Sequence, residues 1–382
     1  MNKDPIAALR ELAAQQGEVA TYERAGKRVY LISRPKLIHQ VLTHKHVSKR
    51  QGKEQATCLL GKGLMTSDGA QNQSQRKLLQ PLFAKQWEEQ WIPIIEQEAN
   101  RLSSDWQPGR RLDTLAEFGK LSLAVACRCL LGGRLPEEPQ LLAALEEVLD
   151  HRGDVSTLTA VRARLDTLCD RLLKRGEGPL IELLLAAPIS TSLRKDEIVT
   201  MLLGAHETTA STMAWSLRLW AMHPDRSPDR AVVAEALRLY PPGWIISRQV
   251  EQTVVVGEHR LQAGATVLMS PMVTHYLAEF WPQPHRFLPE RFRGQVPPRG
   301  SYFPFGGGDR VCVGQRLAWV EAETVLRVIA RDWRLEPCDP GPVKLRYLAA
   351  LRPACGLPAV VREATPGQVG NSPGTARSGP HE

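Results

Sequence analysis

The residues with the clearest chemical potential form a short glycine-rich loop that presents one cysteine. Phe305 is followed by three glycines, and Cys312 comes shortly after them, just before an expected helix. Glycines allow tight turns and a close approach of the backbone to a flat ligand. A thiol near a helix N-terminus is stabilised as the thiolate. The pattern therefore favours a cysteine whose sulfur ligates a flat, metal-containing group.

Two other interpretations of this loop are possible. A dinucleotide-binding loop needs a third glycine, but Val311 stands at that position and no βαβ unit surrounds it. A buried structural cysteine stays open as the simplest alternative.

A second group of chemically active residues lies in an apolar helix expected from about Asp196 to His223. Glu207 and Thr208 stand next to each other there, and burying them is costly unless they have partners or a function. Back-bonding of the Thr208 hydroxyl to a helix carbonyl is the structural alternative. A zinc-protease helix is excluded because Ala210 replaces the second histidine.

The cysteine loop resembles the haem-ligand signature of the cytochromes P450 at every fixed position. The matching residues are Phe305, Gly308, Arg310, Cys312 and Gly314. The resemblance implies haem b (iron protoporphyrin IX), with Cys312 as the axial ligand of the iron and dioxygen as co-substrate. It also implies the P450 fold, which is mainly α with a small β region, in a compact variant. The implied activity is a monooxygenase that inserts one oxygen atom into a C–H bond.

The resemblance assigns roles to residues outside the loop as well. Glu207 and Thr208 match the acid–alcohol pair that delivers protons to dioxygen. The implied haem-contacting residues are Asn72, Arg76, Arg248, Phe305, Gly306 and Arg310. Glu235, Arg238 and Arg291 match a buried triad that supports the haem loop during folding and takes no part in the chemistry.

The chain departs from the family pattern at three places. Asn72 replaces a common histidine, and Ala205 replaces a common second glycine. Few residues separate Pro224 from Glu235, where many members carry further helices, and this predicts the compact variant.

The composition indicates one globular domain. Of the 382 residues, 43% are hydrophobic and 24% are charged, close to the globular average. We assign residues 1–363 to the haem domain and predict that residues 364–382, rich in Gly, Pro, Ser and Thr, are disordered. Periodicity predicts a hairpin over 19–33, helices through most of 76–223, short strands after Pro241 and a final helix from about Gln315 to Arg331.

Charge and cysteine content bear on partners and compartment. The net charge of +8 favours an acidic protein partner, while the scattered basic residues argue against nucleic acid. Because no reductase motif is present, we expect electrons from NAD(P)H to arrive through a separate ferredoxin and ferredoxin reductase. Seven cysteines without a disulfide framework, and no apolar run long enough to span a membrane, predict a cytoplasmic protein. A monomer is expected, and peripheral membrane contact stays open.

The expected substrate is large and apolar. The residues predicted to line the pocket include Leu203, Gly204, Trp244 and Ile246, without a charged anchor. The turn Pro241–Arg248 and the compact length are similar to bacterial carotenoid-ring hydroxylases, with Trp244 expected to pack flat against a β-type ring. A fatty-acid hydroxylase is the second candidate, and a haem-thiolate protein without monooxygenase activity is a third.

Overall fold

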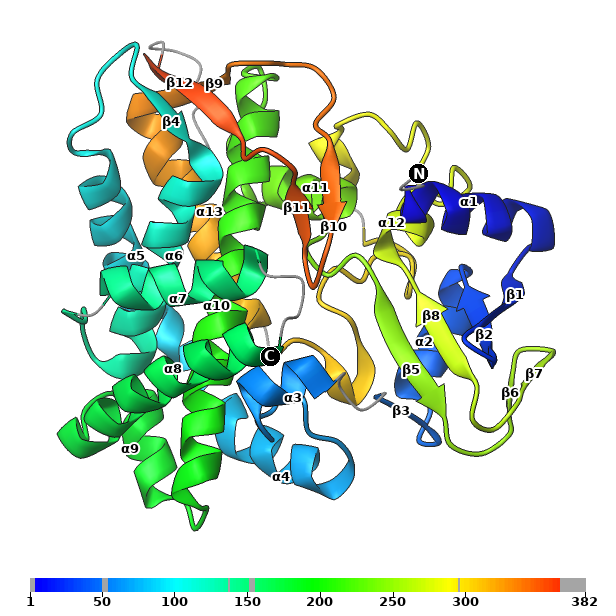
Figure 1. Ribbon diagram of the computed structural model, residues 1–382. Coiled ribbons are helices and arrows are strands. Elements are labelled where there is room, and N and C mark those ends of the chain that lie inside the picture. The colour runs from blue at the N-terminus through cyan, green and yellow to red at the C-terminus, as the bar shows by residue number, and fades with distance from the viewer. Residues whose placement is uncertain (1–3, 50–53, 137, 151–154, 295, 365–382) are drawn as a thin grey trace, which may run out of the picture.

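The computed structural model describes residues 4–49, 54–136, 138–150, 155–294 and 296–364. Most helices gather on one side of the molecule, and a five-stranded sheet lies on the other (Figure 1). The predicted mainly α fold with a small β region is therefore confirmed. All of the predicted disordered tail except Ala364 lies outside the described residues.

The helices are numbered in their order along the chain. They are α1 (Pro5–Gln16), α2 (Pro35–Thr43), α3 (Glu54–Leu60), α4 (Gly69–Leu79), α5 (Glu88–Ser103), α6 (Thr114–Leu131), α7 (Glu138–Asp150), α8 (Val155–Arg175), α9 (Pro179–Ala186), α10 (Thr191–Ala221), α11 (Arg230–Leu239), α12 (Pro271–Thr274) and α13 (Gln315–Asp332). Short 3-10 turns η1 (Gln80–Phe83), η2 (Lys85–Trp87), η3 (Pro289–Phe292) and η4 (Gly308–Arg310) lie between them.

The strands form four small sheets. They are β1 (Val19–Arg24), β2 (Lys27–Ile32), β3 (Val47–Lys49), β4 (Arg111–Asp113), β5 (Ile246–Val250), β6 (Val254–Val256), β7 (His259–Leu261), β8 (Thr266–Met269), β9 (Trp333–Pro337), β10 (Leu345–Tyr347), β11 (Leu351–Pro353) and β12 (Pro358–Glu363). The largest sheet has the order β1-β2-β8-β5-β3, and only its β2–β8 pair is parallel. The register of β3 against β5 places Lys49 opposite Arg248.

Helix α10 runs through the middle of the helical part and packs against α6, α11 and α13 (Figure 1). It begins at Thr191, five residues before the expected start, because the Ser190 hydroxyl accepts a hydrogen bond from Leu193 N at 3.2 Å. From Ile198 to Ala221 most of its side chains are buried. A polar side chain on this helix therefore needs a partner, or must face a site. Turns, bends and irregular residues without a further helix join α10 to α11, and the compact variant stays a prediction.

A fully buried ion pair holds α11 to the chain that leads to Cys312. Nε and Nη2 of Arg238 each donate to a different Glu235 carboxylate oxygen, both at 2.7 Å. Arg291 Nε adds a bond of 3.3 Å to Glu235 Oε1. The remaining Arg238 donors reach the carbonyl oxygens of His275, Pro284 and Arg286. The structure thus brings together the three residues of the predicted triad, and it satisfies the buried charges.

His275 extends this network to the segment just before the cysteine loop. Its Nδ1 lies 3.1 Å from Arg238 O, and its Nε2 accepts a hydrogen bond from Phe303 N at 3.1 Å. These contacts require a neutral ring with the proton on Nδ1. Burial lowers the pKa of His275 to about 3, which agrees with that state. Tyr302 adds a hydroxyl bond of 2.9 Å to Ala234 O.

We predict that Arg238→Ala is strongly destabilising, because it leaves the Glu235 carboxylate buried without its main cation. Breaking one side of a buried pair costs about 3–5 kcal/mol. Chemical denaturation of the purified protein measures the loss. The matched control is Arg327→Ala, whose exposed pair with Glu96 should contribute about 1 kcal/mol or less. Equal losses in both variants would contradict a supporting role for the triad.

Candidate functional site

The cysteine loop, residues Phe305–Gly314, turns tightly before α13. Gly306 and Gly308 have φ values of 72° and 63°, which L side chains rarely adopt. A Cβ on Gly308 would collide with the Leu42 carbonyl oxygen, so the glycine also allows α2 to pack closely. Cys312 N donates to Phe305 O at 2.9 Å and closes the loop. The sequence therefore presents Cys312 on a fixed turn at the start of α13.

The Cys312 thiol is accessible to solvent, although protein atoms crowd around it. This crowding raises the pKa of the thiol, while the Gly314 N–H and the Arg76 charge act in the opposite direction. Both opposing groups favour the thiolate form. Of the seven cysteines, Cys312 is the one that stands on a glycine-rich turn at a helix N-terminus.

Cations gather on the sheet side of the cysteine loop. Lys49, Arg248 and Arg310 lie close enough for each to affect the others, and Asp68 is the acid among them. Burial and the neighbouring arginines lower the pKa of Lys49 to about 8, and burial and Arg310 lower the pKa of Arg248 to about 10. Such a cluster is suited to an anionic ligand with more than one charge. Lys49 was not predicted, because its position depends on the β3–β5 register.

Helix α4 ties its own N-terminus to the cysteine loop. Arg310 donates to Ser67 O at 2.9 Å and pairs with Asp68, which caps α4. Arg76 bonds to Val311 O. The amide of Asn72 is buried and donates to Leu64 O at 2.9 Å and to Ser67 Oγ at 3.1 Å. Asn72 therefore holds the chain beside α4, and a direct contact with a cofactor would require one of these bonds to break.

One face of α10 is open beside the buried core. Thr208 is exposed, and its hydroxyl donates to Gly204 O at 2.9 Å, the back-bonding considered from the sequence. A Cβ on Gly204 would lie 3.7 Å from Met65 Cε. Met65 is 40% exposed, which is unusual for a large apolar side chain. Leu203, Gly204 and Ile246 are all half-buried. This part of α10 thus presents a hydroxyl next to apolar side chains.

The Glu207 carboxylate forms an ion pair with Arg352. Its Oε1 lies 3.0 Å from Arg352 Nε on β11. Both residues line a polar cavity of about 310 Å³, together with His206 and Arg346. Burial lowers the pKa of His206 to about 4, so this ring is neutral. The partner Arg352 could not be predicted, because it lies 145 residues further along the chain.

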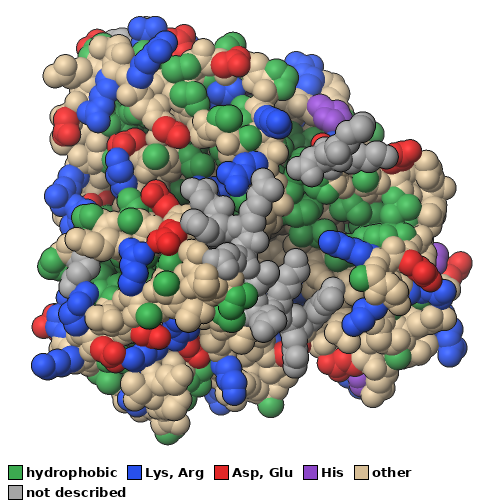
Figure 2. Space-filling model, in the orientation of Figure 1, with side chains coloured by type: hydrophobic (Ala, Val, Ile, Leu, Met, Phe, Trp, Pro, Cys, Tyr) green, Lys and Arg blue, Asp and Glu red, His purple; other side chains and the backbone are tan. Residues whose placement is uncertain are grey.

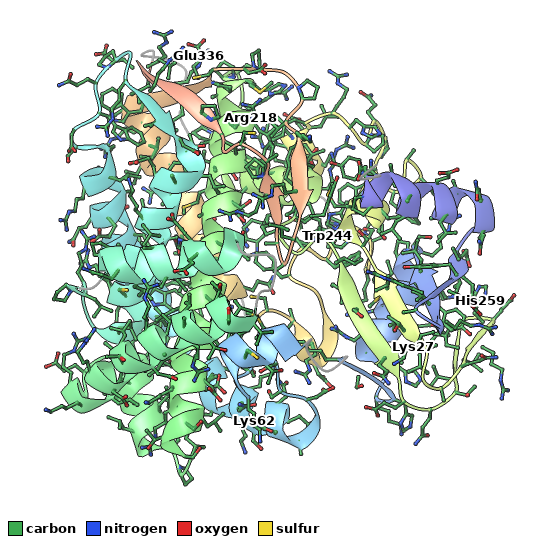
Figure 3. The ribbon with its side chains drawn as sticks, in the orientation of Figure 1. Lys27, Lys62, Arg218, Trp244, His259 and Glu336 are labelled. Atoms are coloured by element: carbon green, nitrogen blue, oxygen red, sulfur yellow. The ribbon has the colours of Figure 1, made fainter. Side chains whose placement is uncertain are left out.

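Trp244 is tied to the β10–β11 hairpin (Figure 3). Its Nε1 donates to Leu348 O at 2.9 Å, and its ring meets Tyr347 edge-on at 5.2 Å and 62°. It also belongs to a cluster with Met272 and Leu351. The indole therefore supports the packing of the hairpin, and its expected flat contact with a substrate stays a prediction.

Comparison with known proteins decides the family. A family model described as cytochrome P450 matches residues 2–175 and 230–354. The chain belongs to the cytochrome P450 family. A curated relative, the cyclooctatin synthase of Streptomyces melanosporofaciens, is 30% identical over 88% of this chain and 87% of its own length. From the same organism, cyclooctat-9-en-7-ol 5-monooxygenase is 28% identical over 87% of this chain and 85% of its own length.

Solved P450 structures agree with this assignment. A six-coordinate P450 from Thermus thermophilus is 31% identical, has a TM-score of 0.80, and is matched over 94% of this chain and 98% of its own. A second P450, from another strain of that species, is 30% identical, has a TM-score of 0.82, and is matched over 94% of this chain and 95% of its own. The family model leaves out residues 176–229, which include Glu207 and Thr208. In the part of this P450 that the structure describes, no helix is long and apolar enough to cross a membrane.

The residues present fit haem, the cofactor of this family. The glycine turn presents one accessible thiol, and Arg76, Arg248, Arg310 and Lys49 surround the loop with more positive charge than Asp68 and Asp309 balance. A flat group that takes a sulfur ligand and carries two carboxylates matches this donor set.

We predict that Cys312→Ser loses the long-wavelength absorption band of the reduced carbon monoxide complex, because a hydroxyl cannot replace the thiolate ligand. Absorbance of the dithionite-reduced, carbon monoxide-saturated protein measures it. Cys355→Ser is the matched control, because Cys355 is also exposed but lies outside the cysteine loop. Retention of the band in Cys312→Ser would refute the assignment.

Proposed function

We propose that this P450 inserts one oxygen atom from dioxygen into a C–H bond of a large, apolar, ring-containing isoprenoid, and that the β-type ring of a carotenoid is the first candidate. The observation that carries this proposal is the open face of α10. There Thr208 lies beside Gly204, whose neighbour is the exposed Met65. A long polyene gains roughly 25 cal/mol for each Å² of apolar surface removed from water.

The molecular surface supports access by an apolar compound. Figure 2 shows hydrophobic side chains gathered in a hollow over the five-stranded sheet. Ile245, Tyr22 and Leu9 are partly buried apolar residues that pack against this part of the sheet. Ile245 is followed directly by Ile246, one of the predicted lining residues. An extended apolar molecule could therefore keep most of its length out of water.

Two alternatives have their own support. The name of one relative describes the monooxygenation of cyclooctat-9-en-7-ol, which makes unsaturated ring alcohols a second substrate class to test. Fatty acids are the third substrate class, and only the sequence motif His206-Glu207-Thr208-Thr209 supports them.

The proposed mechanism assigns separate tasks to the residues of the site. When bound, haem supplies the activation of dioxygen and the transfer of oxygen. Cys312 holds the iron, and the Lys49–Arg248–Arg310 cluster with Arg76 binds the propionates. Thr208 Oγ1 holds a proton one helical turn from Gly204, and a rotation about χ1 would release it from Gly204 O. Glu207 draws protons from the polar cavity, and Arg352 keeps its carboxylate oriented.

Electrons are proposed to come from NAD(P)H through a separate ferredoxin and its reductase. Lys77 follows Arg76 on α4, and Arg316 lies in the first turn of α13, directly after the cysteine loop. Arg316 is partly balanced by Glu88, with the two side chains 2.6 Å apart. An acidic partner would be attracted to this face, and salt would weaken that attraction.

Product analysis tests the proposed substrate class. The reconstituted enzyme receives β-carotene, an unsaturated ring alcohol and a fatty acid at equal concentration, with ferredoxin, reductase and NADPH. We expect the carotenoid to be hydroxylated first. Hydroxylated ring alcohol with untouched carotenoid would promote the second class, and hydroxylated fatty acid alone would overturn the isoprenoid proposal.

We predict that Thr208→Ala diverts electrons from product to hydrogen peroxide while haem content stays normal. A positioned proton donor contributes about 10²–10⁴-fold to a reaction, and Ala removes the donor. The ratio of product to NADPH consumed measures the loss. Thr208→Ser keeps a hydroxyl and should recover most of the coupling. Normal coupling in Thr208→Ala would move the proton donor to another group.

A further inference from the structure

The loop that carries Met65 is held by side chains from three helices. Arg162 of α8 donates to Leu59 O at 2.8 Å, at the end of α3 that leads into the loop, and Asp196 of α10 accepts from Lys62 N at 2.9 Å. Gln75 of α4 donates to Lys62 O at 2.7 Å. Because the backbone of residues 61–67, here called the 61–67 loop, relies on these side chains, their state decides where the loop lies.

A buried glutamate, Glu197, also bonds to the backbone of the 61–67 loop. It is fully buried on α10, and its Oε2 accepts from Leu64 N at 3.0 Å. Its other oxygen makes no well-formed hydrogen bond among the described residues, although the Gln75 amide lies close enough to the carboxyl group to affect its pKa. Asp196, the preceding residue, pairs with Arg162 at 2.6 Å. The Arg162 guanidinium therefore forms its ion pair with Asp196 and not with Glu197.

The loop fits α10 so closely that only glycines are tolerated at two positions. A Cβ on Gly61 would collide with the Asp196 carboxylate, and one on Gly63 with Thr200 Oγ1. Closed packing therefore keeps water away from Glu197. It also fixes Met65 against Gly204, one turn before Thr208.

We infer that Glu197 is a positioning residue: buried and neutral, it holds the 61–67 loop closed over the substrate side of α10, and its ionisation releases the loop. The inference rests on the proposed function, because it gives the loop the task of confining the substrate. It assigns Glu197 no contact with substrate or cofactor.

The electrostatics of the junction agree with this role. Burial raises the pKa of Glu197 to about 7, the Leu64 N–H and the Gln75 amide lower it, and Asp196 raises it. Lys62 belongs to the loop itself, and Arg162 and Asp166, which pair with each other at 2.9 Å, also lie at this junction. In an open loop Glu197 would meet water and titrate near a pKa of 4.5. The contribution of neutral Glu197 to the closed state is therefore complete below a pH of about 4.5. This contribution is lost as the pH rises through about 7.

Hydrogen exchange measures the loop directly and needs no substrate turnover. After correction for intrinsic exchange, we expect the amides of residues 61–66 in the haem-loaded wild type to open roughly tenfold more at about pH 8 than at about pH 6. Glu197→Gln, which is always neutral, should show a flat profile with the loop closed. Glu89→Gln, an exposed glutamate on α5, is the matched control and should behave as wild type.

Gly63→Ala supplies the opposite comparison, because its Cβ should keep the loop open at every pH. Substrate affinity is read in parallel from the haem absorbance shift with β-carotene and the ring alcohol. If the inference holds, affinity falls from about pH 6 to about pH 8 in wild type but not in Glu197→Gln. Equal exchange profiles in wild type and Glu197→Gln would overturn it. A normal exchange result with no carotenoid binding would instead count against the proposed substrate alone.

Discussion

The buried carboxylate of Glu235 is the contact on which the position of the cysteine loop depends. Its two oxygens receive fully buried bonds from Arg238 and partly buried bonds from Arg291 and Leu288 N. A charge in that position is favourable only when each of these partners is in place. His275 then transmits the arrangement to Phe303, two residues before the cysteine loop begins. The position of the Cys312 thiol therefore depends on a buried ion pair that lies outside the cysteine loop.

Charged and apolar side chains lie on different sides of the cysteine loop. Strands β3 and β5 and helix α4 supply cations, while α10 and the 61–67 loop supply apolar side chains and one hydroxyl. The two sets are joined at Ser67 and Asp68, which bond to Arg310 from the end of the loop that carries Met65. A shift of the 61–67 loop would therefore affect both the cofactor side and the substrate side of the site.

Local sequence patterns were sufficient for much of the fold and site. The glycines before Cys312 and the spacing of Glu235 and Arg238 are close in sequence, so their geometry follows from a turn and one helical repeat. The hairpin and the final helix were also predicted, and β1–β2 and α13 confirm them.

Partners that depend on tertiary packing could not be predicted. Lys49 reaches the cation cluster only through the β3–β5 register, Arg352 meets Glu207 from another part of the chain, and His275 is one of ten histidines with nothing local to distinguish it. The sequence predicted Trp244 as a pocket-lining residue, but it gave no sign that the indole N–H bonds to Leu348 O. Distances along the chain do not reveal such contacts.

The central claim is that this P450 transfers one atom of dioxygen to an apolar substrate at Cys312-bound haem. Turnover under isotopically heavy dioxygen, in ordinary water, tests it most directly by mass spectrometry of the product. We expect one heavy oxygen atom in each product molecule, and the second atom of the heavy dioxygen in water. Product that carries oxygen from the solvent, or that forms equally well without dioxygen, would contradict it.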